Sequence, residues 1–188
     1  MIRNQLRRIG IEITPFYLTQ VDADTRKPPE IKGDSKLYSS GFLCEDDLVH
    51  MKNDPRGYPT EKLVRHLQMG RLCFGVKKGK DVAAFMWIDL RECNFEPYRF
   101  PLWEDEAYTF NAYTMESFRG LNIAPFMAYH CYRELNGMGR DKIYGISEYL
   151  NRSAIRYKMK LGARKTKLYL FLGLFKRLRR LYLIRSFS

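Results

Sequence analysis

The sequence predicts a mixed α/β (α+β) fold with one central sheet of six to seven strands and about four flanking helices. Three observations predict this class. Segments whose apolar residues alternate with period two are interleaved with segments of helical spacing. The expected order (β, α, α, β, β, β, α, β, α, β) indicates antiparallel strands in the first half. The 188 residues, of which 45% are hydrophobic, are enough for one domain with a packed core.

Local signals define the elements of the first half. Thr60 is expected to cap a helix that ends at Gly70, because a hydroxyl accepts from early helical amides and glycine suits a left-handed stop. Pro97 and Pro101 predict that residues 92–105 are irregular, because both interrupt regular backbone pairing. The expected elements are a strand at 9–21, a polar loop at 22–41, helices at 45–53 and 60–70, and strands at 71–76 and 82–90 joined by a hairpin turn.

The central stretch, residues 107–128, combines a strand, a short loop and the start of a helix. Alternation predicts a strand that presents one face of four residues, namely Tyr108, Phe110, Ala112 and Thr114. The alternation stops at 119–124, and Pro125 suits the first turn of a helix that runs to Leu135. A loop that enters a helix leaves backbone N–H groups exposed at the positive end of the helix dipole. This stretch therefore predicts a phosphate or pyrophosphate site.

The second half continues with a strand at 142–149, a helix at 151–160 and a strand at 165–172. Residues 1–172 are expected to form the main domain. The remaining segment, 173–188, is basic and amphipathic, and its apolar residues recur at helical spacing. It could therefore be a surface helix, or the closing strand of the same sheet.

Charge is distributed unevenly along the chain. Residues 151–188 contain twelve Lys and Arg and no Asp or Glu, so this segment accounts for the whole net charge of +12. Such a segment favours an anionic partner, either a membrane surface or an acidic carrier protein, over a merely solvated surface. Nucleic acid is the least favoured partner, because the segment has few aromatic residues and a continuous apolar face.

Composition also bears on compartment and on metal binding. The four cysteines form no C-x-x-C pair, which is typical of reduced thiols in a cytoplasmic protein. The three histidines lack the spacing of zinc ligands, so no metal site is expected. No apolar run reaches the roughly 18 residues of a membrane span, which leaves a cytoplasmic protein or one peripheral to a membrane.

Two motifs resemble the GNAT superfamily of N-acetyltransferases. Residues 119–124 (RGLNIA), between a strand and a helix, resemble its acyl-CoA signature, and Asn151 to Ala154 followed by Leu161-Gly162 resembles its final helix. The resemblance implies that acetyl-CoA or another acyl-CoA binds here, with pantetheine beside Thr114 and Met115. The pyrophosphate contacts that it implies are Arg119, Gly120, Leu121, Asn122, Ile123 and Ala124, with Asn151 and Ser153 as further coenzyme contacts.

The chain departs from that family pattern at two positions. Asn122 replaces a glycine, so its side chain must point away from the phosphates or donate to them. The family's tyrosine acid falls four residues after the alanine, where this chain has Lys158, and Tyr157 lies one residue earlier. One residue turns a helix by about 100°, so packing in the core is expected for Tyr157, and the family's acid role is the alternative for it. For Lys158 a solvated side chain is expected, and a role as substitute acid is the alternative.

A general base is needed to take a proton from the attacking amine. Glu106 at the start of the central strand and Glu148 at the end of the next strand are both candidates, and ordinary surface or ion-pair roles are the alternative for each. The leading interpretation is an acyl-CoA-dependent N-acyltransferase acting on an amine. The alternatives are an enzyme that uses an acyl carrier protein as donor, and a non-catalytic GNAT-like module that binds a membrane or nucleic acid. Residues 22–59 and 92–105 are expected to shape the acceptor pocket.

Overall fold

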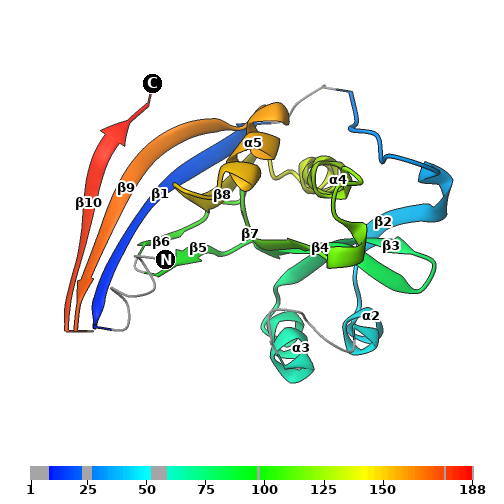
Figure 1. The fold of residues 1–188 in the computed structure, drawn as a ribbon, viewed down its shortest axis with the longest axis horizontal. Coiled ribbons are helices and arrows are strands. Elements are labelled where there is room, and N and C mark those ends of the chain that lie inside the picture. The colour runs from blue at the N-terminus through cyan, green and yellow to red at the C-terminus, as the bar shows by residue number, and fades with distance from the viewer. Residues whose placement is uncertain (1–8, 23–26, 52–58, 97, 176, 188) are drawn as a thin grey trace.

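The computed structural model describes residues 9–22, 27–51, 59–96, 98–175 and 177–187 (Figure 1). Within them an eight-stranded sheet has the order β10-β9-β1-β8-β7-β4-β3-β2, and β5 and β6 form a separate hairpin. The strands are β1 (Ile11–Asp22), β2 (Tyr38–Phe42), β3 (Leu72–Lys78), β4 (Asp81–Asp89), β5 (Glu92–Phe95), β6 (Tyr98–Pro101), β7 (Glu106–Thr114), β8 (Lys142–Glu148), β9 (Arg164–Leu174) and β10 (Leu178–Ser186). The helices are α2 (Glu45–His50), α3 (Thr60–Gln68), α4 (Ile123–Gly137) and α5 (Arg152–Lys160), with 3₁₀ turns at Ser35–Leu37 and Glu116–Phe118. The predicted α+β class is confirmed, although the sheet has more strands than expected.

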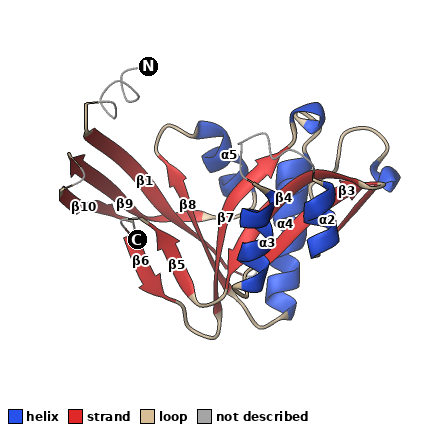
Figure 2. Ribbon diagram, turned by 90° about the horizontal axis from the view of Figure 1, so that it is seen from below, coloured by secondary structure: helices blue, strands red, loops and turns tan. Residues whose placement is uncertain are grey.

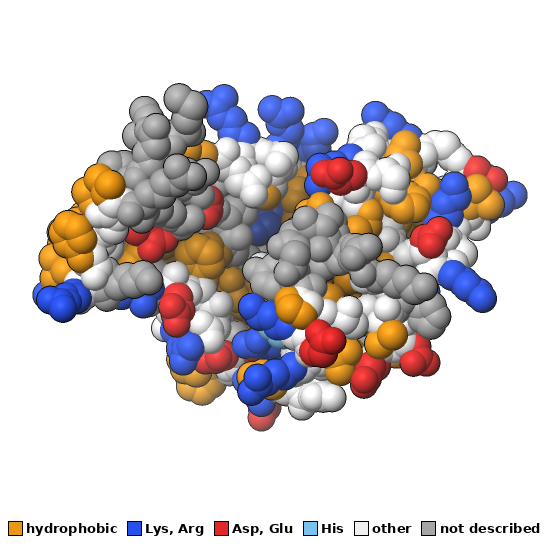
Figure 3. Space-filling view, turned by 60° about the horizontal axis from the view of Figure 1, so that its bottom comes forward, with side chains coloured by type: hydrophobic (Ala, Val, Ile, Leu, Met, Phe, Trp, Pro, Cys, Tyr) orange, Lys and Arg blue, Asp and Glu red, His pale blue; other side chains and the backbone are white. Residues whose placement is uncertain are grey.

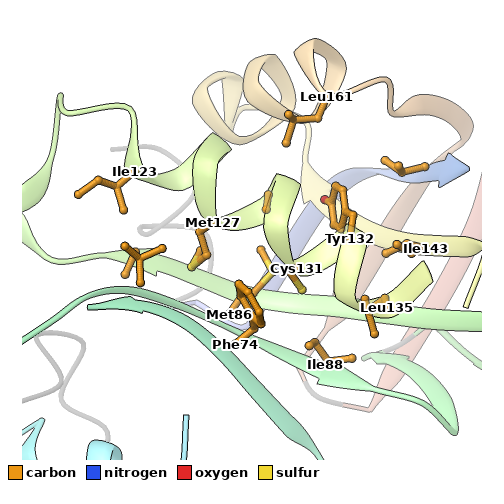
Figure 4. Packing of buried hydrophobic residues seen from close by; sticks show 14 of the residues in the cluster. Phe74, Met86, Ile88, Ile123, Met127, Cys131, Tyr132, Leu135, Ile143 and Leu161 are labelled. Atoms are coloured by element: carbon orange, nitrogen blue, oxygen red, sulfur yellow. The ribbon is translucent and has the colours of Figure 1, made fainter. Parts of the chain in front are cut away.

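Helices cover both faces of the sheet (Figures 1 and 2). α4 and α5 lie on one face, and α2 and α3 lie on the other. The core on the first face is built around α4, whose Met127, Cys131 and Leu135 recur every four residues and are fully buried against β3, β4 and β8 (Figure 4). Burying each large apolar side chain contributes roughly 1.5–3 kcal/mol, so this helix is held by its packed stripe.

One parallel pair of strands interrupts an otherwise antiparallel sheet. β7 and β8 are parallel, and their register runs only from Glu106↔Lys142 to Thr109↔Gly145. Both strands continue beyond that point, to Thr114 and Glu148, and stay paired with β4 and β1 but not with each other. The sheet therefore splits between β7 and β8, next to the starts of α4 and α5.

A bulge in β7 changes which side chains share a face. Asn111 has a left-handed φ of 51°, and the register with β4 slips between Phe85↔Tyr113 and Trp87↔Phe110. Phe110 and Tyr113 consequently pack on the same cluster, which lies between the sheet and helices α2 and α3. The expected single face from Tyr108 to Thr114 is therefore wrong, because strict alternation requires an unbroken strand.

Two regions that were expected to be irregular contain strands. The polar loop at 22–41 ends in β2, which pairs with β3, and residues 92–105 contain the β5–β6 hairpin. Pro101 is the last residue of β6, where a missing N–H costs little. Pro97 lies outside the described residues. Thr60 is the first residue of α3, and Pro59 occupies the cap position instead.

The C-terminal segment is a strand, so the helical alternative is wrong. β10 pairs antiparallel with β9 from Leu178↔Leu174 to Ser186↔Lys167. Pairing with β9 satisfies the backbone groups that an unpaired edge would expose. Hydrophobic and basic side chains gather at this end of the molecule (Figure 3). The described residues include no helix that is long and apolar enough to cross a bilayer.

Candidate active site

The loop before α4 is held open by two residues with left-handed backbone. Gly120 has a φ of +81°, and Asn122, the N-cap of α4, has a φ of 66°. The Asn122 side chain makes no capping bond to α4, because its Nδ2 donates to the Glu30 carbonyl at 2.7 Å. The side chain therefore points away from the loop amides. The first N–H groups of a helix have no intrahelical acceptor, so those of α4 remain available to a ligand.

A neighbouring segment supports this loop from outside. The Lys32 N–H donates to the Leu121 carbonyl at 3.0 Å, and Ile31 is buried in the core cluster below α4. Together with the bond from Asn122 to Glu30, these contacts join residues 30–32 to the loop. The long polar loop thus helps to position the predicted phosphate site.

A cavity of about 620 Å³, here called the outer cavity, opens at the loop. Its cationic lining residues are Lys32, Arg119, Arg156 and Lys160, and no Asp or Glu lines it among the described residues. The remaining lining residues are Ala112, Thr114, Phe118, Gly120, Asn122, Ile123, Ala124, Pro125, Asn151, Ser153, Ala154 and Tyr157. Cations and open helix amides around one cavity suit a phosphorylated ligand.

Arg119 is engaged by the protein itself. Its guanidinium donates to the Thr114 carbonyl at 3.3 Å, to the Tyr113 hydroxyl at 2.9 Å and to Glu116 at 3.2 Å. Arg119 therefore fixes the loop to the end of β7. The charge that it presents to the cavity is partly compensated by Glu116.

The start of α5 forms the opposite wall of the outer cavity. Asn151 caps this helix, because its Oδ1 accepts from the Ala154 N–H at 3.2 Å and from the Ser153 hydroxyl at 3.0 Å. Asn151 and Ser153, both predicted to contact the coenzyme, line the outer cavity. Their polar groups are used to close the helix end.

A second cavity of about 310 Å³, here called the inner cavity, lies in the split between β7 and β8. Six residues line both cavities, so the two adjoin each other: Ala112, Thr114, Ala124, Asn151, Ala154 and Tyr157. The inner cavity is further lined by Met86, Phe95, Thr109, Phe110, Asn111, Tyr113, Ile146, Ser147, Glu148 and Lys158. Ligand-sized space therefore lies on both sides of these six residues, at the loop and in the split of the sheet.

The two candidate bases lie at opposite ends of the parallel pair. Glu148 is half-buried at the end of β8 and lines the inner cavity. Glu106 is buried at the start of β7, where its carboxylate accepts from the Tyr144 hydroxyl at 2.9 Å and from the Trp103 N–H at 3.0 Å. The structure does not bring Glu106 to either cavity, because its register partner is Lys142 at the far end of β8. Its contacts are those of a structural carboxylate.

Tyr157 and Lys158 both reach the inner cavity, but in different environments. Tyr157 is half-buried between the two cavities, and burial raises the pKa of its hydroxyl to about 12. Lys158 is buried, with Nζ 3.0 Å from the Ser147 hydroxyl and 3.2 Å from the Ile146 carbonyl. The expectation of a solvated Lys158 is therefore wrong.

Three of the residues predicted to contact the coenzyme do not present their side chains to the outer cavity. Met115 lines neither cavity: its N–H donates to the Ala83 carbonyl at 2.9 Å and its side chain packs below the sheet. Leu121 faces the core, and only its carbonyl meets Lys32. The Ile123 side chain is buried, which leaves its backbone to the outer cavity.

Sequence reasoning missed the burial of Lys158 and the supporting segment at 30–32. A signal for Lys158 was present, because Ala154 and Lys158 are four residues apart and so share one face of α5. Nothing local in the sequence indicates that residues 30–32 meet the loop 90 residues later. That contact depends on the fold.

Comparison with known proteins identifies the fold through structures alone. No family model and no curated sequence matches the chain. A Novosphingobium aromaticivorans structure assigned to the GNAT family of acetyltransferases matches 88% of this chain and 66% of its own, at TM-score 0.61 and 18% identity. The Escherichia coli ribosomal-protein-S18-alanine N-acetyltransferase matches 66% of this chain and 76% of its own, at TM-score 0.53 and 18% identity.

A Salmonella typhimurium protein solved with acetyl-CoA matches 76% of this chain and 96% of its own, at TM-score 0.53 and 12% identity. The chain spans between 53% and 66% of the length of three of the structures that it resembles, including the Novosphingobium one. Similarity at these identities is evidence of architecture. The chain has the fold of the GNAT acetyltransferases.

Proposed function

We propose that this protein is an N-acyltransferase that moves an acyl group, most simply acetyl, from acyl-CoA to an amine by direct attack. The observation that supports this most is that the two cavities adjoin each other at the split between β7 and β8 and share six lining residues. An anion-accepting helix start lies at the outer cavity, and a carboxylate lies at the inner one. In transfer from a phosphorylated thioester to an amine, the helix start would bind the phosphates and the carboxylate would take the proton of the amine.

The residues of the outer cavity fit coenzyme A. The amides of 120–124 and the α4 dipole would hold the diphosphate, and Lys32, Arg156 and Lys160 on the cavity wall would attract the remaining phosphate charge. The pantetheine arm would pass Ala112, Thr114 and Tyr157 into the inner cavity. Acetyl-CoA in the Salmonella structure supports this choice of donor.

Glu148 is the residue proposed to take a proton from the acceptor amine, directly or through one water. It lines the inner cavity together with Phe95 and Phe110, which supply apolar contact surface for an acceptor. Phe95 belongs to the β5–β6 hairpin, so the region at 92–105 lines this end of the cavity through that residue. The E. coli neighbour acts on an alanine of a protein, which supports an amine acceptor.

Calorimetry with acetyl-CoA and thiol release over a panel of small amines and peptides test this function. We expect saturable binding, and amine-dependent thiol release that Glu148→Gln lowers by about 100-fold, as for loss of a general base. Glu104→Gln, at an exposed carboxylate outside both cavities, is the matched control. Absence of both binding and thiol release would exclude an acyl-CoA-dependent enzyme.

An acyl carrier protein is a second candidate donor, favoured by the exposed arginines of the C-terminal hairpin. Arg177, Arg180 and Arg185 are exposed there, and carrier proteins present acidic surfaces. Activity with an acyl-carrier donor that exceeds activity with acyl-CoA, and that Arg177→Glu with Arg180→Glu lowers, would select this donor. Equal response of both donors to the two substitutions would exclude docking on the hairpin.

A further inference from the structure

The inner cavity contains a buried amine that the function proposed above does not use. The Lys158 side chain is 6% exposed, and its Nζ donates to the Ser147 hydroxyl and the Ile146 carbonyl on β8. A Cβ at Gly145 would lie 2.8 Å from Nζ, so glycine there makes room for the amine. Three residues of β8 thus hold Nζ at the wall of the split.

Lys158 is not part of an ion pair in the described part of the chain. Burial alone accounts for the change in its acidity and lowers the pKa of the ammonium to about 8. A buried charge without a counter-ion costs several kcal/mol, so the fold gains nothing by retaining this lysine for stability. Methionine would fill the same volume without that cost. A buried lysine that lines a cavity is therefore a candidate for chemistry.

The chemistry that remains to be supplied is protonation of sulfur. When an amine displaces a thiol from a thioester, the sulfur departs with an electron pair, and an acid of matched pKa assists its departure. A free thiol has a pKa near 8.5, close to that of Lys158. Tyr157 is the other possible acid in this part of the cavity, but the pKa of its hydroxyl is raised to about 12, so it gives up its proton less readily than Lys158.

We propose that the Lys158 ammonium is the catalytic acid that protonates the leaving thiol of the acyl donor. In the step, the amine nitrogen bonds to the acyl carbon, the carbon–sulfur bond breaks, and sulfur keeps its electron pair. Lys158 gives one proton to sulfur, and Glu148 takes one proton from nitrogen. Solvent then returns a proton to Lys158 and removes one from Glu148, so both residues regain their starting states. This role rests on the proposed N-acyltransferase function.

The first test measures the bound thiol instead of turnover. Free CoA is bound to wild type, to Lys158→Met and to the control Lys80→Met, whose lysine is exposed in the β3–β4 turn, and thiolate absorbance is followed against pH. An ammonium beside the sulfur lowers the thiol pKa, so wild type and the control should form thiolate at a lower pH than Lys158→Met. The other titratable groups that line the cavity, Glu148, Tyr157 and Tyr113, are present in all three proteins.

The second test compares acetyl-CoA with its selenoester analogue, whose leaving group is far more acidic and needs no proton. Lys158→Met should lower kcat on the thioester by about 100-fold or more. On the selenoester the same substitution should lower kcat much less. KM should change little. Gly145→Ala, which keeps the lysine but displaces Nζ, should show the same pattern with a smaller loss.

Equal losses of Lys158→Met on both donors, or an unchanged pKa of the bound thiol, would overturn the role of Lys158 and leave the proposed function standing. If Lys158→Met proves too unstable to assay, Gly145→Ala decides by the same two readouts. Failure of wild type to bind CoA or to release thiol would instead remove the proposed function, and this inference with it.

Discussion

The two helices that border the cavities both begin at an asparagine, and the two asparagines act in opposite ways. Asn122 has a left-handed φ of 66° and turns its side chain to Glu30, which leaves the first amides of α4 uncapped. Asn151 has a φ of −80° and caps α5 through the Ala154 N–H. One helix start thus lacks a side-chain cap, whereas the other is closed by its own side chain.

This difference assigns separate tasks to the two walls of the site. α4 contributes backbone donors and a dipole, which bind anions without any particular side chain. α5 contributes the side chains of Tyr157 and Lys158, which can hold or move a proton. Substitutions at the start of α4 should therefore change binding, and substitutions on α5 should change turnover or stability.

The largest expected effect is at Ala124, in the first turn of α4 and on the wall shared by both cavities. Ala124→Glu places a carboxylate where the proposed diphosphate would bind, and removing two charge-assisted hydrogen bonds costs about 4 kcal/mol, or about 1,000-fold in Kd. Calorimetry with acetyl-CoA measures this. The same carboxylate should stabilise α4 slightly, because it faces the positive end of the dipole.

Two variants separate charge from bulk in that experiment. Ala124→Gln has nearly the size of glutamate without its charge and should bind CoA more tightly than Ala124→Glu. Arg152→Glu places a carboxylate in the first turn of α5, outside both cavities, and should leave Kd within a fewfold of wild type. Equal losses for the glutamine and glutamate variants would mean that the loop does not bind an anion.

The next effect concerns stability against pH at Lys158. Its pKa is about 8 in the folded protein and about 10.4 when unfolded, so between these values the unfolded chain binds more protons and stability rises with pH. Across this window the free energy of unfolding of wild type should rise by on the order of 3 kcal/mol relative to that of Lys158→Met. Urea unfolding near pH 7.5 and pH 10 measures the difference. A constant difference between the two proteins would show that Lys158 is solvated.

Much of the fold could be predicted because helices and strands each give a characteristic local spacing of apolar residues. The helical spacing at 125–135 and the alternation in 142–149 correspond to α4 and β8. The β5–β6 hairpin was missed because proline ordinarily interrupts a strand, and here Pro101 stands at the last position of one. β10 was equally compatible with a helix by pattern, and pairing with β9 decided between the two.

The site was predictable only where it is contiguous in sequence. The loop at 119–124 and the helix that follows it carry their own signals, and the structure places them at one cavity. Glu106 was misassigned because its distance from the cavities depends on strand register, which composition does not encode. The spacing of Ala154 and Lys158 indicates a shared face of α5, but the room for the buried amine depends on Gly145, a residue of another element.

A smaller effect is expected when Asn122 is replaced. Asn122→Ala should lower the free energy of unfolding by about 2 kcal/mol, because alanine disfavours a left-handed backbone and the bond to Glu30 is lost. Asn122→Gly keeps the conformation, so it should cost about 1 kcal/mol and retain CoA binding. Urea denaturation of both variants measures the costs. A glycine variant less stable than the alanine variant would mean that the left-handed conformation is not needed.

The smallest expected effect is at Asn151. Replacing Asn151 and Asn122 each by serine compares the two asparagines directly. Asn151→Ser keeps a capping oxygen, so its stability should stay within about 0.5 kcal/mol of wild type, whereas Asn151→Ala should lose about 1 kcal/mol. Asn122→Ser should behave like Asn122→Ala, because serine gains nothing from capping at a left-handed residue. Thermal and urea unfolding of the four variants would show whether serine distinguishes the two sites. If serine is tolerated equally at both, the two asparagines serve the same role and the open terminus of α4 is not a special feature of the site.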